Sequence, residues 1–348
     1  MKSIYVHLSP SDEFSKKFLF NSAINPIDRV YYFNLGKSGY KNIAGLKKHS
    51  FISEVYRYIA FLWGAGKLDR KNMVVFCHTT RYALAGIVLS KIFGVGKVIY
   101  FNHGVPYIGY SGIMRYILKY LEMLNVCCSD LVLTVSSSML PFLKKGICGR
   151  KNIQAILPGS SSGLPEEYYV ASSSLKENSA TEKTIFVYAG RFQRRKGVYL
   201  LLEAWKEHQR RCKDDELWMC GFVVSPENST VVDAPGVRCL GYVDDMEKIY
   251  EQADVVVNCS WHEGFGYTLL EGAAKGCCIL SADIPGPNII FSKWMRSQLF
   301  ESMNASELSL RMTEFSQNKK RLYCAKILSL RSAKRFLDSK IRYPGVTS

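Results

Sequence analysis

Short apolar segments with strand character alternate with helical segments along this chain, and they form two successive series. The strand candidates of the first series are residues 2–8, 30–35, 73–77, 97–101 and 131–135, and its helical segments are 51–63, 81–93 and 112–126. The second series has strand candidates at 184–189, 217–220, 237–240, 254–257 and 277–281, with helical segments at 196–209 and 267–275. Strand–helix alternation at this rhythm is typical of a parallel, doubly wound sheet. The sequence therefore predicts an α/β protein with two Rossmann-like domains.

A polar, serine-rich segment without apolar periodicity separates the two series at residues 171–183 and is predicted to be a linker. The 348-residue chain has room for two domains of ordinary size. We therefore expect an N-terminal domain over 1–170 and a second domain over 184–325. The remaining residues, 326–348, are expected to form a helical tail that packs back on the N-terminal domain.

Composition narrows the class of protein. With 47% hydrophobic residues the chain can bury proper cores, which excludes a disordered protein. It has no uninterrupted apolar run of 18 residues, and its first residues lack the pattern of a signal peptide. The eleven cysteines include no C-x-x-C pair, so neither a disulfide framework nor a zinc site is expected. These features predict a cytoplasmic protein in a reducing compartment.

The net charge of +16 is unevenly distributed. Residues 1–170 contain 21 Lys and Arg against 9 Asp and Glu, a net +12, whereas residues 171–348 contain 25 against 21, a net +4. This asymmetry favours an anionic partner for the first half, either a membrane surface or a polyphosphate. A basic surface that only keeps the protein soluble is the alternative. Because no nucleic-acid-binding module accompanies the charge, nucleic acid is not an expected partner.

The most specific site candidate is the stretch 258–276 (NCSWHEGFGYTLLEGAAKG), which follows an apolar strand candidate and opens a helix. Its turn at 263–266 contains two glycines, which let the backbone approach a ligand closely. The amides of the first helical turn favour an anion such as a phosphate. The carboxylates of Glu263 and Glu271 bracket this turn and suit hydroxyl groups. The combination predicts a site for a sugar nucleotide.

A second candidate lies at the start of the second series. A glycine follows the strand candidate 184–189 directly, and Arg191 and Lys196 occupy the transition to the next helix. Two cations at the edge of a sheet suit a diphosphate leaving group, although basic loop residues are more often merely solvated. Both candidates fall at the carboxyl ends of strands in one Rossmann-like unit, so we expect them to converge.

These residues carry a family resemblance. The segments GRFQRRKG (190–197) and EGFGYTLLEGAAKG (263–276) resemble family 4 of the retaining glycosyltransferases, of the bacterial surface-polysaccharide type. Segments 129–136, 241–245 and 253–260 are similar to family segments at the corresponding places, and the two glutamates fit the family pattern E-x7-E. The resemblance implies the GT-B fold, in which two Rossmann-like, doubly wound domains face a central cleft.

The resemblance also implies a role for each matching residue. Arg191 and Lys196 would bind the donor diphosphate and stabilise it as it departs. Glu271 would bind the ribose, Glu263 the transferred sugar, and Val243 would lie beside the base. His103, in FNHG after a first-domain strand, would reach the donor sugar near the reaction centre. The implied catalytic residues are His103, Glu263, Arg191 and Lys196, and the implied donor-binding residues are Arg191, Lys196, Val243, Glu263, Gly264, Phe265, Gly266, Tyr267, Thr268 and Glu271.

The implied reaction retains the configuration at the anomeric carbon without a clear protein nucleophile. The acceptor hydroxyl would attack on the face that the diphosphate leaves, and the leaving phosphate would take its proton. The sequence contains no Asp-x-Asp motif, so we expect no metal and no cofactor besides the co-substrate, a nucleotide-diphosphate sugar. Three segments depart from the family pattern, namely 8–14, which has no glycine, 158–160 and 285–287. The first two segments belong to the acceptor side, and the third belongs to the sugar end of the donor site. None of them belongs to the diphosphate site.

The helical segment 112–126 is a candidate for the acceptor side. It combines an apolar stripe with Arg115 and Lys119 and with several tyrosines, which suits an interfacial helix on an anionic membrane. An ordinary helix that faces the core is the alternative. We expect peripheral contact with the inner face of the cytoplasmic membrane and a glycan acceptor on a lipid pyrophosphate.

Two further functions remain in view. One is a non-catalytic carbohydrate- or lipid-binding protein that keeps the fold, against which the complete set of charged site residues argues. The other is a nucleotide-dependent oxidoreductase, which would need a G-x-G-x-x-G turn after a strand, whereas the Gly94-Val95-Gly96 segment precedes one.

Overall fold

The computed structural model of the protein describes residues 4–9, 29–34, 51–144, 152–160, 162–175, 183–222 and 234–346. The chain forms two compact units, Met1–Gly163 together with Asp338–Ser348, and Leu164–Leu337. The chain thus passes into the second unit at Leu164, ahead of the segment 171–183 in which the linker was expected. Residues 176–182 of that segment lie outside the described residues. Within the expected tail, only the part from Asp338 onward belongs to the first unit.

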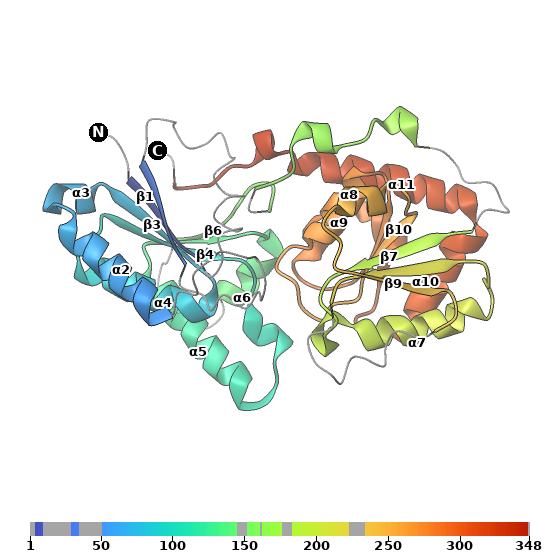
Figure 1. Ribbon diagram of the computed structural model, residues 1–348, viewed down its shortest axis with the longest axis horizontal. Helices are drawn as coiled ribbons and strands as arrows, with labels where there is room; N and C mark the ends of the chain where they lie inside the picture. Colours follow the sequence, from blue (N-terminus) through green and yellow to red (C-terminus); the bar gives the residue numbers. More distant parts are fainter. Residues whose placement is uncertain are drawn as a thin grey trace. The chain divides into compact units, whose positions relative to one another are not determined.

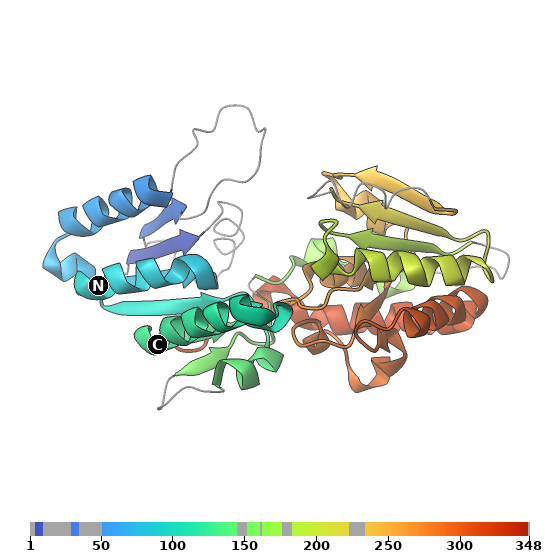
Figure 2. The same cartoon turned by 90° about the horizontal axis from the view of Figure 1, so that it is seen from below.

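The first unit contains a six-stranded parallel sheet with the order β2-β1-β3-β4-β5-β6 (Figure 1). Its strands are β1 (Ile4–Ser9), β2 (Arg29–Asn34), β3 (Met73–His78), β4 (Lys97–Asn102), β5 (Leu131–Thr134) and β6 (Ile153–Ala155). Its α-helices are α2 (Phe51–Gly64), α3 (Lys67–Lys71), α4 (Thr80–Ile92), α5 (Gly112–Cys128) and α6 (Leu140–Lys144). Every residue of β5 and nearly every residue of β3 and β4 is buried, as is usual for parallel strands covered on both faces. Helices α4 and α5 run side by side, and α4 packs on β3 and β4 (Figure 2).

The second unit contains another six-stranded parallel sheet, with the order β12-β11-β10-β7-β8-β9. Its strands are β7 (Ile185–Ala189), β8 (Glu216–Cys220), β9 (Val237–Gly241), β10 (Val255–Asn258), β11 (Cys278–Ala282) and β12 (Leu299–Phe300). Its α-helices are α7 (Val198–Gln209), α8 (Met246–Tyr250), α9 (Tyr267–Ala274), α10 (Ala305–Gln317) and α11 (Lys319–Ala333). Figure 1 shows α7 on one face of this sheet and α8 and α9 on the other. Helix α10 packs against α7, and α11 packs against α9 and β11.

Each sheet has a hydrophobic core of its own, made by the apolar strand residues and the apolar faces of the covering helices. In the second unit the largest of these side chains is Trp205 of α7, which is fully buried and packs edge-on against Phe186 of β7. Burying an aromatic side chain of this size stabilises a fold by roughly 2–3 kcal/mol. The predicted α/β class with two doubly wound, Rossmann-like sheets is therefore confirmed.

Candidate functional site

The two glycine-containing loops singled out in the sequence follow β7 and β10, which are neighbours at the centre of the second sheet. The strand order reverses at this pair, because β8 and β9 extend from β7 while β11 and β12 extend from β10. In doubly wound sheets, ligands bind beyond the carboxyl ends of the strands at such a reversal. The fold therefore brings both halves of the predicted site to the position where sheets of this class bind ligands.

Gly197 joins the two loops. It has φ of +72° and caps α7, so it takes up the left-handed conformation that side chains disfavour. A Cβ atom at this position would lie 2.0 Å from the carbonyl oxygen of Cys259, the residue that follows β10. The amide of Trp261 also donates a hydrogen bond to the carbonyl of Arg195 at 3.1 Å. The loop after β7 therefore lies directly on the loop after β10, and only glycine permits this approach.

Lys196 and Glu263 meet at this junction. The ammonium of Lys196 forms an ion pair with Oε1 of Glu263, and Ser260 Oγ donates to the same oxygen at 3.1 Å. The side chains are 18% and 23% exposed, so the pair is only partly accessible to solvent. Burial raises the pKa of Glu263, but the Lys196 ammonium and the hydrogen bonds from Lys196 and Ser260 outweigh it, and the pKa lies below its usual value. The site thus holds a cation and an ionised carboxylate in contact.

The turn at 263–266 is held from two sides. Gly286 has φ of +103°, and a Cβ atom there would lie 2.2 Å from the carbonyl oxygen of Glu263, so the loop after β11 packs against the turn. Phe265 is buried, and its ring centroid lies 5.2 Å from those of Tyr267 and Phe336. The Phe265 side chain therefore anchors the turn by packing, and only its backbone is placed to meet a ligand. Segment 285–287, which departs from the family pattern, thus packs against the turn at 263–266.

Helix α9 begins directly after the turn. Gly266 caps it with φ of +100°, and no side chain of the described residues caps it by a hydrogen bond. The amides of its first turn, which include those of Tyr267 and Thr268, have no acceptor within the helix. These amides and the partial positive charge of the helix N-terminus suit an anion. Residues 264–268 therefore contain the glycine turn and the helix N-terminus that the sequence predicts.

Three further predicted donor-binding residues, Arg191, Val243 and Glu271, follow strands or lie on a helix that begins at the same carboxyl edge of the second sheet. Arg191 is exposed in the loop after β7, where Tyr188 donates a hydrogen bond to its carbonyl at 3.0 Å. Val243 is half-buried in the loop after β9. Glu271 is half-buried on α9, and the Tyr250 hydroxyl donates to its Oε2 at 3.4 Å. Burial and, after it, the Glu271 carboxylate raise the pKa of Tyr168, which places a second tyrosine near this acid.

His262 was not singled out in the sequence. It is buried beside the Lys196–Glu263 pair, and burial, opposed by Glu263 and assisted by the Arg195 and Lys196 cations, lowers its pKa to about 4. Its imidazole is therefore neutral at neutral pH. Its position next to Glu263, shortly after a strand, is the signal that could have identified it.

His103, predicted to be catalytic, belongs to the first unit and follows β4. Its Nε2 lies 2.9 Å from Nδ1 of His78, and His78 Nε2 lies 3.0 Å from Nδ1 of His7. Burial lowers the pKa of His103 to about 3. His103 is thus a neutral, half-buried imidazole at one end of a chain of three histidines. His7, in β1, was not recognised in the sequence as part of any site.

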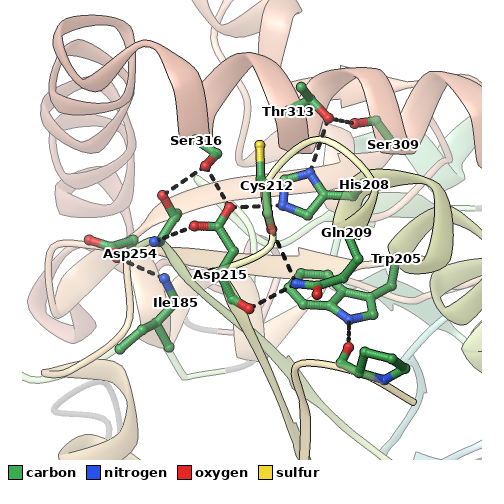
Figure 3. Close-up of polar contacts among 12 residues, drawn as sticks. Ile185, Trp205, His208, Gln209, Cys212, Asp215, Asp254, Ser309, Thr313 and Ser316 are labelled. Atoms are coloured by element: carbon green, nitrogen blue, oxygen red, sulfur yellow. Dashed lines mark hydrogen bonds and ion pairs between the residues drawn. The ribbon is translucent and has the colours of Figure 1, made fainter. Parts of the chain in front are cut away.

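A cluster of metal-ligand type lies at the opposite edge of the second sheet, where β7 and β8 begin (Figure 3). The ligand atoms of His208, Cys212 and Asp215 lie within 4.8 Å of one another. Asp215 accepts hydrogen bonds from Thr184 N at 2.7 Å and Ser316 Oγ at 2.5 Å, and contacts His208 Nε2 at 2.9 Å. His208 Nδ1 lies 3.0 Å from Thr313 Oγ1. These bonds join α7 and α10 to the sheet and satisfy the buried groups by themselves, so this cluster is structural.

Comparison of the sequence with known proteins identifies glycosyltransferases as its relatives. Residues 183–318 match the family model described as glycosyl transferases group 1. The chain is 22% identical to the capsular polysaccharide biosynthesis glycosyltransferase CapM of Staphylococcus aureus, over 62% of this chain and 60% of that protein. It is 31% identical to the lipopolysaccharide core biosynthesis glycosyltransferase LpsE of Rhizobium meliloti, over 34% of this chain and 35% of that protein. The matches thus span less than two thirds of either relative.

Solved structures resemble the chain over nearly its whole length. Sucrose-phosphate synthase from Thermosynechococcus elongatus has a TM-score of 0.72 at 13% identity, over 97% of this chain and 95% of that one. Anabaena Alr3699/HepE in complex with UDP and glucose has a TM-score of 0.70 at 14% identity, over 97% and 96%. The chain has the GT-B fold. The matched residues 183–318 lie within the second unit, Leu164–Leu337, which carries the Lys196–Glu263 site.

The histidine chain makes the first GT-B unit sensitive to acid. In the unfolded chain a histidine has a pKa of about 6.5, whereas burial lowers the pKa of His7 and His103 to about 3 and that of His78 well below its usual value. Below pH 6.5 only the unfolded state therefore binds these protons. Each histidine then removes about 1.4 kcal/mol of stability per pH unit. The buried Glu122 carboxyl, whose pKa burial raises to about 7, has the opposite sign and offsets the effect of about one of the three histidines.

We therefore expect the free energy of unfolding to fall steeply between pH 6 and pH 5, before most carboxylates titrate. Denaturant titrations of the full chain at half-unit pH steps measure this slope. The interval from pH 8.5 to 7.5, in which these three histidines are almost wholly neutral in both states, is the control. Equal stability at pH 7 and pH 5 would contradict the assignment of neutral, buried imidazoles.

Proposed function

We propose that the protein is a retaining glycosyltransferase that moves a hexose or N-acetylhexosamine from a nucleotide-diphosphate sugar to a glycan. The observation that carries the proposal is the Lys196–Glu263 pair at the β7–β10 reversal, inside the segment that matches glycosyl transferases group 1. The names of CapM and LpsE place those relatives in capsular polysaccharide and lipopolysaccharide core biosynthesis. We assign this chain to polysaccharide biosynthesis of the same kind, of O-antigen or capsule.

In the proposed donor complex the two cations of the loop after β7 neutralise the diphosphate. Arg191 is exposed at the start of that loop, and Lys196 stands at its end. The first-turn amides of α9 bind the same phosphate oxygens from the other side. Binding then exchanges part of the Lys196–Glu263 contact for a Lys196–phosphate contact, which leaves the ionised Glu263 to accept hydrogen bonds from the sugar. Glu271, one turn further along α9, binds the ribose, and Val243 lies beside the base.

The proposed reaction breaks the bond between the anomeric carbon and the diphosphate and forms a bond to the acceptor oxygen on the same face. The acceptor proton passes to the leaving diphosphate. Charge develops on that diphosphate, so the preorganised cations and amides stabilise the transition state more than the ground state. Because Lys196 and Arg191 supply the positive charge and the sequence has no Asp-x-Asp motif, the proposed reaction needs no metal.

The donor is tested by thermal unfolding with a panel of nucleotide sugars at concentrations well above the expected Kd. A ligand at about 100 times its Kd stabilises a fold by about 2.7 kcal/mol. UDP, UDP-glucose and UDP-N-acetylglucosamine are the first members, since the structural relatives were solved with UDP, glucose, UDP-glucose or GlcNAc. We expect one nucleotide sugar to raise Tm and to be consumed when acceptor is added. Stabilisation without any transfer or hydrolysis would favour a non-catalytic carbohydrate-binding protein instead.

We further propose that the acceptor is a glycan on a lipid pyrophosphate and that the first unit contacts the inner face of the cytoplasmic membrane. Residues 112–117, at the start of α5, are exposed and carry apolar, aromatic and basic side chains. Ile113 is 79% and Tyr116 72% exposed, and Arg115 and Lys119 lie beside them. Such a surface suits an anionic bilayer, in which rings and aliphatic groups enter the interface while cations meet the headgroups.

None of the described helices is long and apolar enough to cross a bilayer. Sedimentation with vesicles of phosphatidylglycerol and phosphatidylcholine tests the proposed membrane contact against pure phosphatidylcholine. We expect binding to the anionic vesicles only, and its loss in the double variant Ile113→Ser, Tyr116→Ser. Leu310→Ser, which removes an exposed apolar side chain from α10 of the second unit, is the matched control. Absence of wild-type binding would reject the membrane contact and leave the donor site untouched.

A further inference from the structure

His262 is a buried residue whose ring nitrogens form no hydrogen bond with any residue that the structure describes. It lies four residues after the end of β10 and directly before Glu263, and it is 8% exposed. Unlike Nε2 of His7, these nitrogens are not sealed from solvent. The neutral imidazole therefore has one donor and one acceptor that only solvent or a ligand can satisfy.

His208 shows what a buried histidine with a structural role looks like in the same unit. Its Nδ1 lies 3.0 Å from Thr313 Oγ1, and its Nε2 lies 2.9 Å from Asp215 Oδ2, so both ring nitrogens have protein partners. Buried polar groups of folded proteins are paired in this way in the great majority of cases. A mostly buried imidazole that lacks such partners lowers the stability of a fold. Its presence at position 262 therefore indicates a role other than packing.

The charges around His262 are those of the proposed diphosphate site. The imidazole lies within electrostatic reach of Glu263, Arg195 and Lys196, and burial, which Glu263 opposes and the two cations assist, lowers its pKa to about 4. The ring is therefore neutral at neutral pH and carries one N–H. A neutral donor can bind an anion here without adding a third positive charge beside the two cations of the loop after β7.

The backbone on both sides of His262 is held in place. The amide of Trp261 donates a hydrogen bond to the carbonyl of Arg195 at 3.1 Å, which ties this segment to the loop after β7. Ser260 Oγ donates to Glu263 Oε1 at 3.1 Å and so bridges the position of His262. The place of the imidazole beside the charged pair is thus fixed before any ligand binds, which is the condition for a preorganised binding group.

We propose that His262 is a donor-binding residue, whose imidazole N–H donates a hydrogen bond to an oxygen of the diphosphate that Lys196 binds. This rests on the proposed glycosyltransferase function, which supplies the diphosphate. The oxygens of an ionised diphosphate are acceptors, so they match an N–H that has no partner in the protein, and hydrogen bonds to ionised acceptors are the stronger ones. His262 thereby recognises the diphosphate itself, whichever sugar or base is attached to it.

Titration of the full-length protein with inorganic pyrophosphate tests the contact, because this probe carries the diphosphate alone. The chain has six histidines, whose ¹⁵N-labelled rings are assigned by single substitutions. We expect the His262 ring signals to shift on binding, and those of His208, at the opposite edge of the second sheet, to stay unchanged. Unchanged His262 signals with bound pyrophosphate would overturn the contact. Absence of wild-type binding at millimolar pyrophosphate would overturn it as well.

His262→Leu separates a ligand role from a packing role. Leucine fills a similar volume without ring nitrogens, so we expect pyrophosphate to bind about 10–100-fold more weakly, the range for one hydrogen bond to a charged group. The midpoint of denaturant unfolding should rise, because a polar group without a partner is removed from a buried position. Wild-type affinity in His262→Leu would overturn the proposal and leave His262 as a packing residue.

Two conservative variants and one control complete this titration. His262→Asn and His262→Gln place an amide N–H near the position of Nδ1 or of Nε2, and we expect one of them to restore most of the affinity. Failure of both would contradict the hydrogen bond. Lys206→Ala removes an exposed cation from α7 of the same unit and should keep wild-type affinity, which controls for unspecific attraction of the anion to a basic protein.

Nucleotides distinguish a contact with the diphosphate from a contact with the sugar. UDP and UDP-glucose, or the corresponding pair for the donor that the thermal panel identifies, should lose affinity by the same factor in His262→Leu. A loss confined to the nucleotide sugar would overturn the diphosphate contact. If the wild type binds pyrophosphate through His262 but transfers no sugar from any donor, the proposed function fails and the contact stands. Sugar transfer by a His262→Leu protein with wild-type affinity would reject the His262 assignment alone.

Discussion

Replacing Lys196 by alanine is expected to lower kcat for sugar transfer by about 10²–10³-fold, the range for loss of one preorganised group that stabilises developing charge. The ammonium lies at the β7–β10 reversal in contact with Glu263, and its removal leaves the departing diphosphate without its fixed cation. It also leaves the Glu263 carboxylate without its ion-pair partner, which raises the pKa of that carboxyl. The initial rate of sugar release from the donor, at saturating donor and acceptor, measures the effect.

Two further variants show whether the effect depends on the place of the lost charge in the molecule and on the charge of Glu263. Lys206→Ala removes an exposed cation from α7 of the same unit and should keep wild-type activity. Glu263→Gln keeps the shape of the acid but not its charge, and we expect it to lower kcat by a similar factor while the protein still binds the nucleoside diphosphate. Wild-type turnover in either Lys196→Ala or Glu263→Gln would contradict the assignment of these two residues to the active site.

Gly197→Ala is expected to destabilise the second unit by about 2–5 kcal/mol, from a left-handed backbone and a steric clash together. The added Cβ atom would lie 2.0 Å from the Cys259 carbonyl oxygen, so one of the two loops must move. Because Lys196 precedes this glycine and Glu263 follows Cys259 in the other loop, the movement also separates the ion pair. We expect activity to fall with stability, as measured by denaturant unfolding and by donor turnover.

Gly241→Ala is the matched control for backbone conformation. Gly241 has φ of +67°, close to the +72° of Gly197, but a Cβ atom there meets nothing within 4 Å. Gly241→Ala should therefore lower the free energy of unfolding only by the penalty for the left-handed backbone, about 1–2 kcal/mol. Equal losses of stability in the two variants would show that the close approach of the loops is not what requires glycine at position 197.

Much of this molecule was predictable because its signals are local. A run such as Val255–Asn258 is apolar throughout, which is typical of a strand buried on both faces. Gly190, directly after β7, and Gly264, six residues after the end of β10, mark turns at the carboxyl edge. The charged residues of the candidate site, Lys196 and Glu263, could be named for the same reason, since each lies within a few residues of a strand end.

Other features depend on segments that are remote in the sequence. The sequence predicted that residues 326–348 form a tail, but α11 remains with the second sheet, where Lys326 forms a buried ion pair with Asp254 at 2.6 Å. The side chain of Phe265, a predicted donor-binding residue, is buried beside Phe336, which is remote from it in the sequence. Segment 8–14, which lacks the glycines of the family loop, lies almost wholly outside the described residues.

The sequence by itself determined the α/β class, the two series of strands and the residue types at the carboxyl edge, because propensity, periodicity and turn chemistry act over a few residues. Only the tertiary structure decided which of those residues meet. Lys196 contacts Glu263 because β10 pairs with β7 rather than with β9, which precedes it in the sequence. His7 reaches His103 because β3 pairs with β1 and β4 in one register. Strand order and register come from packing summed over a whole sheet, and no short segment of the chain encodes that sum.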